Sequence, residues 1–470
     1  MKTEVIYTQL NNPHRTGNCE IVTRTVNYRA TSKMRKYYQA ALVIIATVSV
    51  VSLLFYRHEY NRLRYVLEVL NFFGKPGRSG VDTNCTKSSA EKKFDFHFDI
   101  PVSSWQRLDN ELYVYSAYSS DAGEVRAIGI GKVNNNLNLT CNIFFEGNIE
   151  PFPGYFVLSP IKSVTEKPNN AKQKYIGYEL LCQYEGGRPP IAISFLNRNE
   201  KNHNDVAILP VTNPPVTYDS NNSVICIAPP MNKPMSTADM ISFLNFHELI
   251  GMDNFIVYDY GIPNTFNEAL KNMAQNPSPY WKFTYTTLPW NFPFTGVHPN
   301  IVRDIIQADC LHRTYNKVMY VTTLSWEEYI VLKYHHLVAD LLFDFGKNTW
   351  PSYVSYKLNT SVFCTEQKDD KRATKNTPIV LRKTHKNKNI IVNRPVYLFK
   401  RDALQRNDLV TEQNDAVTDL MFINRYQHCN RINDDTSTDT YDNSILRFAG
   451  DMQNAPIFKQ YVTGKIFSSN

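Results

Sequence analysis

Two hydrophobic patterns divide the chain near residue 220. Between residues 94 and 220, short runs of β-branched and aromatic residues are separated by clusters of Asn, Gly and Pro. Runs of this length and composition, bounded by turn residues, are typical of β-strands. The clearest runs lie at residues 111–117, 125–130, 141–145 and 191–195. We therefore expect a smaller, mostly antiparallel β-rich module over residues 94–220.

From residue 221 to about residue 465, apolar runs alternate with amphipathic segments. Ser236 followed by Asp239 is typical of a helix N-terminus, and the apolar positions after them share one helical face as far as Gly251. Further helices are expected at residues 266–275 and 301–315, between strands at residues 224–228, 255–258, 281–288 and 318–321. This alternation predicts an α/β fold with a mainly parallel sheet, helices on both faces, and ligands at the carboxyl ends of the strands.

One segment predicts a membrane anchor. Residues 37–56 carry no charge and are mostly apolar, and about 20 residues of helix cross a bilayer core. The segment begins too far into the chain for a cleaved signal peptide. Because basic residues precede it, we expect an uncleaved signal anchor, with residues 1–36 as a cytosolic tail and the C-terminal domain in the lumen. A buried core helix is the alternative. Residues 57–93 are expected to form a stem.

Composition narrows the compartment and the partners. The net charge of +7 is spread along the chain, so it predicts no nucleic-acid partner. Seven of the eight cysteines follow the apolar segment without the close spacing of a metal site. In an oxidising lumen some of the seven should form disulfides, and the odd number leaves at least one free or bonded between chains. Four Asn-x-Ser/Thr sequons lie on the same side, at Asn84, Asn138, Asn221 and Asn359.

The order of the motifs over residues 105–465 resembles glycosyltransferase family 92. The segments that carry the resemblance are ELYVYSAYSSD, SVICIAPPM, FHELIGMDNFIVYDYG, IQADCLHRTYNKVMYVTTLSWEEYIV, KNIIVNRPVYLF and INRYQHC. The resemblance implies a GT-A (Rossmann-like) glycosyltransferase domain over residues 221–465, held in the Golgi membrane as a single-pass type II protein. It also implies metal-dependent, inverting transfer of a hexose, typically galactose from UDP-galactose, onto a glycan or glycoprotein acceptor.

An altered acidic motif is the expected metal site. Where the family pattern has Asp-x-Asp-Glu-Phe, this chain has Ser325, Trp326, Glu327, Glu328 and Tyr329. Mn²⁺ or Mg²⁺ prefers carboxylate oxygen and can neutralise a leaving diphosphate. Glu327 is therefore the expected metal ligand, Ser325 can offer only a hydroxyl to the donor, and Glu328 is the expected catalytic base. A solvated turn at the end of a strand is the alternative interpretation.

Two further acids have both a functional and a structural interpretation. Asp259 ends the second strand of the α/β part, where a carboxylate can accept hydrogen bonds from the ribose or uracil of a donor. A turn before Gly261 and Pro263, capped by the same side chain, is the alternative. Asp309 matches an acid of the family and is assigned a catalytic role, with Arg313 assigned to donor binding. These two residues lie four apart on one helix face, so an internal salt bridge is the alternative.

The C-terminal motif departs from the family pattern. Residues 424–428 (NRYQH) carry the histidine out of register. His428 could reach the metal through a short shift of the chain, and a packed or surface histidine is the alternative. Glu412 and Asp415 are further candidates for the catalytic base.

Two functions remain open at this point. Glu327, Asp259 and Asp309 retain the acids that an active transferase needs. The departures at Ser325 and Asn424 instead favour a degenerate transferase that serves as a glycan-binding or scaffolding protein of the secretory pathway.

Overall fold

The computed structural model divides into two units, Met1–Ala90 and Glu91–Asn470. The residues that it describes are 47–49, 104–109, 111–120, 123–133, 139–148, 150–161, 174–197, 207–214, 223–230, 235–276, 281–348, 355–374, 377–388, 390, 392, 394–400, 413–414, 419–429 and 440–462. Residues 47–49 are helical. The expected tail, stem and remainder of the anchor lie outside the described residues. Within the described part of the chain, no helix is long and apolar enough to cross a membrane.

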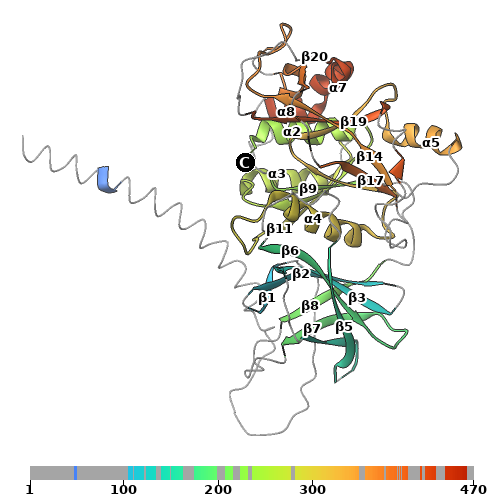
Figure 1. The fold of residues 1–470 in the computed structure, drawn as a ribbon. Helices are drawn as coiled ribbons and strands as arrows, with labels where there is room; N and C mark the ends of the chain where they lie inside the picture. Colours follow the sequence, from blue (N-terminus) through green and yellow to red (C-terminus); the bar gives the residue numbers. More distant parts are fainter. Residues whose placement is uncertain are drawn as a thin grey trace, which may run out of the picture. The chain divides into compact units, whose positions relative to one another are not determined.

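Eight strands form a β-rich module at the start of the second unit (Figure 1). They are β1 (Gln106–Asp109), β2 (Leu112–Ser120), β3 (Glu124–Lys132), β4 (Leu139–Phe145), β5 (Phe152–Pro160), β6 (Tyr175–Gln183), β7 (Pro190–Asn197) and β8 (Ala207–Thr212). Their order is β1-β2-β3-β6-β5-β4-β7-β8, and β8 also pairs with β2. The sheet therefore closes into a barrel. Its neighbours are antiparallel except for the closing β2–β8 pair, and the four strands expected most clearly from the sequence are β2, β3, β4 and β7.

Alternating apolar residues fill the interior of the barrel, where Val125 and Leu180 are fully buried. The disulfide Cys141–Cys182 joins β4 to β6 across the strand between them. That intervening strand, β5, places Gly154 against the disulfide, because a Cβ at this position would overlap the Sγ atom of Cys182. Glycine is thus required here by close approach rather than by backbone conformation.

The rest of the unit is built around a seven-stranded sheet. Its strands are β9 (Ser223–Ala228), β10 (Asn254–Asp259), β11 (Thr284–Pro289), β12 (Tyr320–Ser325), β14 (Ser355–Leu358), β17 (Val396–Lys400) and β18 (Gln413–Asn414). Their order is β11-β10-β9-β12-β17-β14-β18. The first four strands are parallel, and β17 is antiparallel to both of its neighbours. The mainly parallel α/β sheet predicted from the alternating pattern is therefore confirmed, although β11 begins three residues later than expected.

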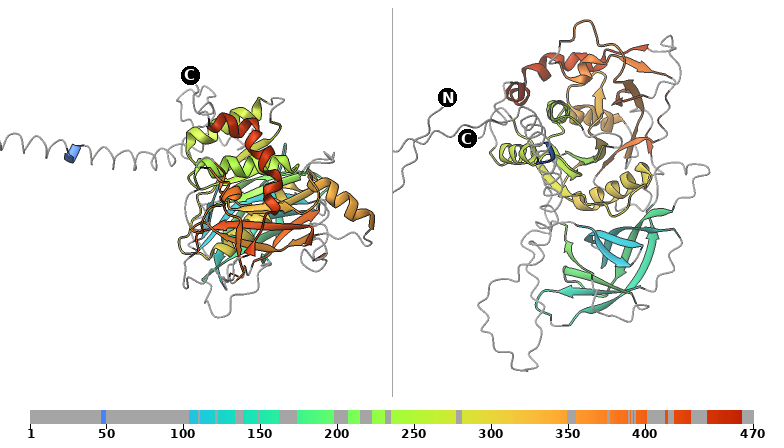
Figure 2. Two further views of the ribbon diagram at one scale, coloured as in Figure 1. Left: turned by 90° about the horizontal axis from the view of Figure 1, so that it is seen from above. Right: turned by 90° about the vertical axis from the view of Figure 1, so that its left-hand side faces the viewer.

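Helices cover both faces of this sheet. Ile225 and Ile227 of β9 pack with α2 (Thr237–Leu249) and α3 (Asn264–Gln275). The alternate residues Val224 and Cys226 pack with α4 (Pro299–Thr314) on the opposite face. The disulfide Cys226–Cys310 fixes β9 to α4. In the right-hand view of Figure 2, α4 lies between the sheet and the barrel, and its residues pack on both.

A second, five-stranded sheet was not expected from the sequence. It consists of β13 (Glu328–Leu332), β19 (Met421–Gln427), β15 (Thr360–Cys364), β16 (His385–Asn387) and β20 (Thr440–Tyr441), in that order. The disulfide Cys364–Cys429 joins the end of β15 to the segment that follows β19. The remaining helices are α5 (Val338–Asn348), α6 (Ile379–Arg382), the 3-10 helix η4 (Ser444–Phe448), α7 (Ala449–Asn454) and α8 (Pro456–Val462). Six of the seven cysteines after the apolar segment thus pair within the chain, and Cys85 lies outside the described residues.

Candidate active site

A pocket opens where the order of the parallel strands reverses. In sequence β9 is followed by β10 and β11 on one side, whereas β12 lies on the other side of β9. The loops that leave β9 and β12 therefore diverge, and ligands of open α/β sheets bind in the resulting crevice. The last residues of the two strands, Ala228 and Ser325, are paired in the sheet and line a pocket of about 330 Å³ together with Tyr260, Trp290 and Arg303. This volume lies within the usual range of small-molecule sites, about 300–1,000 Å³.

Aromatic side chains form one wall of the pocket, and the barrel supports them. The rings of Trp290 and Phe292 stack with centroids 5.6 Å apart, and Phe294 also lines the pocket. Trp105 packs edge-on against Trp290 at 5.3 Å, and Tyr175 of β6 stacks on Phe294 at 4.1 Å. An aromatic wall offers a flat apolar surface to the base or sugar ring of a ligand.

The turn between β12 and β13 brings two unpaired oxygens to the end of the sheet. Trp326 anchors the turn in the core, with its ring 5.2 Å from that of Phe243. The Oγ atom of Ser325 is buried and has no hydrogen-bond partner among the described residues. The same is true of Glu327 Oε1, whose nearest cationic group is the Nε atom of Arg425 at 4.0 Å. Buried polar atoms are seldom left without a partner, so both are candidates for contact with a ligand or an ion.

The surroundings of Glu327 raise its pKa above the usual value for a glutamate. Burial raises its pKa above the usual value, and the neighbouring Glu328 raises it further. Arg425 and Arg303 oppose this rise. A bound cation would favour the ionised form in the same way as these arginines do.

Glu328 differs from Glu327 in its surroundings, because two arginines hold its carboxylate. Its side chain is fully buried and accepts hydrogen bonds from Arg303 Nη1 at 2.8 Å, Arg425 Nε at 3.0 Å and the backbone N–H of Ser325 at 2.8 Å. Burial alone would raise the pKa of Glu328, but the two guanidinium groups lower it well below its usual range. Such a carboxylate is a poor proton acceptor. The geometry favours a positioning role over catalysis, since Glu328 holds Arg303 at the pocket and accepts a hydrogen bond from the backbone of Ser325 in the turn.

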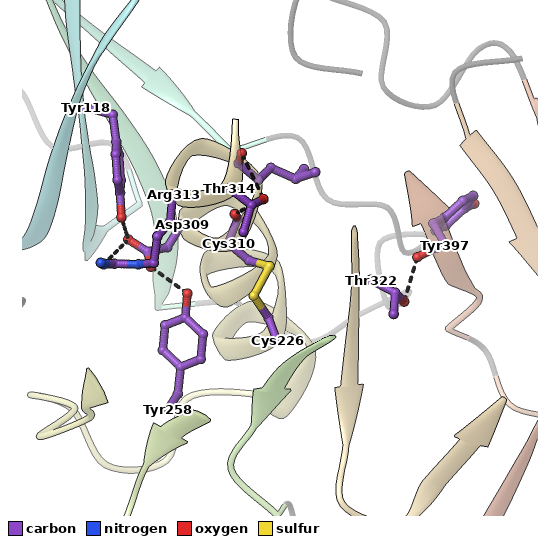
Figure 3. Close-up of a disulfide and its surroundings, with 10 residues drawn as sticks. Tyr118, Cys226, Tyr258, Asp309, Cys310, Arg313, Thr314, Thr322 and Tyr397 are labelled. Carbon is purple, nitrogen blue, oxygen red and sulfur yellow. Dashed lines mark hydrogen bonds and ion pairs between the residues drawn. A yellow bond between two sulfur atoms is a disulfide. The ribbon is translucent and has the colours of Figure 1, made fainter. Parts of the chain in front are cut away.

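Asp309 lies at a junction of three elements rather than at the pocket (Figure 3). It accepts hydrogen bonds from Tyr118 of the barrel at 2.6 Å, Tyr258 of β10 at 2.5 Å, Arg313 of α4 at 3.1 Å, and Ser116. Burial alone would raise the pKa of Asp309, but Arg313 and the three hydroxyl groups lower it below its usual value. The internal salt bridge considered from the sequence is present, and it belongs to a buried network that joins the barrel to the α/β part.

Asp259 caps a turn, which is the structural alternative to donor binding that the sequence left open. Its Oδ1 atom accepts from the backbone N–H of Ile262 at 2.9 Å, and its Oδ2 atom accepts from Asn267 at 2.6 Å. The chain turns here through Gly261, whose φ is 90°. Asp259 therefore shapes the turn that presents Tyr260 to the pocket, and this contact favours an indirect role over direct contact with the donor.

His428 is engaged elsewhere. Its Nδ1 atom lies 2.6 Å from the carboxylate of Glu366, beside the Cys364–Cys429 disulfide, and the side chain is half exposed. In the part of the chain that the structure describes, no group of three or more His, Cys, Asp and Glu side chains is placed to hold a metal ion. The structure thus does not join His428 to Glu327 in a preformed metal site. Glu412 and Asp415 lie outside the described residues.

Sequence reasoning missed Arg303 and the aromatic wall. The WNFPF segment at residues 290–294 is an unusual concentration of aromatic residues after a predicted strand, and it could have been assigned to the rim. Arg303 gives no comparable signal, because its importance depends on Glu328 and on Arg425 from the distant strand β19.

Comparison with known proteins identifies the protein family that the α/β part resembles. No curated protein matches the chain. The family model described as Glycosyltransferase family 92 matches residues 221–447, which include the seven-stranded sheet, the pocket and the second, five-stranded sheet. The barrel precedes the matched region. Residues 221–447 of this protein are therefore assigned to glycosyltransferase family 92.

Proposed function

We propose that this protein transfers a hexose, galactose from UDP-galactose in the first instance, onto a glycan or glycoprotein acceptor. Membership of family 92 assigns the α/β part to the glycosyltransferases. The main support for a nucleotide-sugar donor is the pocket between β9 and β12, where the order of the parallel strands reverses. It combines an aromatic wall with the unpaired oxygens of Ser325 and Glu327 at the adjoining turn.

A GT-A arrangement is the proposed form of the domain. Its support is the 3-2-1-4 order of the parallel strands β11, β10, β9 and β12, which matches the first four positions of the strand order in a dinucleotide-binding sheet. The altered acidic motif then falls at the end of the fourth strand, beside the pocket. Such a position allows one end of a nucleotide sugar to lie against the aromatic wall and its diphosphate to lie near the turn.

Mn²⁺ or Mg²⁺ is the proposed cofactor, and the residues present fit it. Magnesium ions in nucleotide enzymes are commonly held by one or two carboxylates, waters and the phosphates of the substrate. Glu327 supplies one carboxylate with an unpaired buried oxygen, and Ser325 supplies a hydroxyl. When bound, the ion would neutralise negative charge on the leaving diphosphate. Arg303 places a fixed positive charge at the pocket, where Glu328 and the Thr323 carbonyl hold its guanidinium group.

The Golgi lumen is the proposed location of the catalytic domain, with residues 37–56 as a type II anchor. The three disulfides support an oxidising compartment. The basic residues ahead of residue 37 support a cytosolic N-terminus.

Calorimetric titration of the Glu91–Asn470 unit with UDP-galactose, with and without Mn²⁺, tests the proposal. Glu327→Gln removes the charge of the proposed metal ligand, and Glu268→Gln makes the same change at an exposed position on α3. We expect binding that requires Mn²⁺, is lost in Glu327→Gln and is unchanged in Glu268→Gln. A folded protein that binds UDP-galactose in neither condition would contradict the proposal and favour the glycan-binding scaffold.

A further inference from the structure

A second hollow lies on the five-stranded sheet and shares no lining residue with the donor pocket. It is a groove of about 660 Å³. Asn359 and Ser361 line it where β15 begins, Phe422 lines it from β19, and Asn443 and Ser444 line it from the start of η4. The proposed donor site does not include this groove.

Two of the lining residues, Asn359 and Ser361, belong to one acceptor sequence for N-linked glycosylation. Asn359, Thr360 and Ser361 form an Asn-x-Ser sequon in the connection between β14 and β15. Asn359 is exposed, and its carbonyl oxygen accepts a hydrogen bond from the N–H of Ile423 at 2.8 Å. The backbone of the sequon is therefore fixed to β19, and Asn359 is an exposed residue of the groove lining.

The lining of the groove suits a sugar. Phe422 is only partly buried: it packs against the hydrophobic core and also lines the groove among polar residues. The hydroxyl group of Ser444 is buried and has no hydrogen-bond partner in the described part of the chain. Asn443 and Asp419 are exposed at the rim. An aromatic face next to amide, carboxylate and hydroxyl groups can pack against the apolar face of a pyranose and bond to its substituents.

We propose that Asn359 carries an N-linked glycan and that the first sugars of this glycan lie in the groove against Phe422. In the modification, the Nδ2 atom of Asn359 bonds to the anomeric carbon of a diphosphate-activated oligosaccharide supplied by the cell. The bond from that carbon to the diphosphate breaks, the diphosphate leaves with the electron pair, and Nδ2 loses one proton. The three disulfides favour an oxidising compartment, the kind in which such donors act. The inference is independent of the transferase activity.

Expression of the full chain in secretory animal cells tests both parts. Mass spectrometry of the peptide that contains Asn359 should find a glycan, and Asn359→Gln and Ser361→Ala should each remove it. An amidase that cleaves N-glycans should release this glycan about tenfold more slowly from the native protein than from the unfolded protein, because the groove must open first. An unmodified Asn359 in the secreted or lumenal protein would overturn the assignment of the site.

Variants at Phe422 test the contact in the groove. Phe422→Ala should bring the native release rate close to that of the unfolded protein, and Phe422→Leu, which retains more of the apolar volume, should have an intermediate rate. Melting of each variant, measured in parallel, distinguishes loss of the contact from loss of the fold. Native release as fast as unfolded release in the wild type, or unchanged protection in a folded Phe422→Ala, would overturn the placement of the glycan.

Discussion

Removal of the charge on Asp309 should destabilise the protein without any change at the pocket. In Asp309→Asn the carboxylate that receives Arg313 and three hydroxyl groups becomes an amide, and its Nδ2 group cannot accept a hydrogen bond. Asp309 is fully buried, and the side chain of Arg313 is 14% exposed. Removal of one partner from a buried ion pair costs about 3–5 kcal/mol, because the other charge remains in a poorly solvated site. We expect a loss of this size in the free energy of unfolding.

Urea unfolding of the Glu91–Asn470 unit, with disulfides intact, measures this loss through tryptophan fluorescence. Asp340→Asn, at an exposed position on α5, is the matched control and should change the free energy of unfolding by less than about 0.5 kcal/mol. The double variant with Arg313→Gln should cost less than the sum of the single variants, since the two residues share one network. A loss below about 1 kcal/mol in Asp309→Asn would refute the buried-network interpretation.

Three further predictions concern the pH dependence of the Asp309 network, the support of the pocket wall and the disulfide of the barrel. The folded pKa of Asp309 lies below its unfolded value of about 3.9. Its contribution to stability is therefore present above that pH and is lost as the pH falls through the folded pKa. In urea titrations, the difference in free energy of unfolding between wild type and Asp309→Asn should shrink below about pH 4. Trp105→Leu should weaken the binding of UDP-galactose by about two- to tenfold in calorimetry, the value of one aromatic pair, although Trp105 only supports the pocket wall; unchanged affinity would show that the barrel does not shape the site. Gly154→Ala should leave Cys141 and Cys182 partly unpaired, which thiol titration of the unfolded protein would detect.

The local pattern was sufficient to predict the parallel half of the fold. The helix start at Ser236 is present, with its Oγ atom accepting from the N–H of Asp239 at 3.2 Å, and strands follow helices at the expected places. The alternation of polar and apolar residues reports directly on burial, so these elements can be recognised one at a time. The second sheet could not be recognised in this way, because β13 pairs with β19, nearly a hundred residues away (Glu328 with Arg425).

Contacts between residues far apart in the sequence also explain why the candidate site was predicted only in part. The sequence located the Ser325–Glu328 turn at a strand end, which depends only on order along the chain. It could not distinguish the surroundings of Glu327 and Glu328, two adjacent acids with opposite pKa shifts. That difference arises from Arg303 and Arg425, which reach Glu328 from other elements. Likewise, the network around Asp309 needs Tyr118 from the barrel, a contact that no helix pattern predicts.

Determination of the structure of the Glu91–Asn470 unit with UDP and Mn²⁺ would show directly whether the pocket between β9 and β12 is the donor site. We expect UDP to lie in this pocket, with its uracil or ribose against the wall formed by Trp290 and Phe292 and its diphosphate beside Ser325 and Glu327. Ordered UDP bound anywhere else on the molecule would contradict the assignment of this pocket as the donor site.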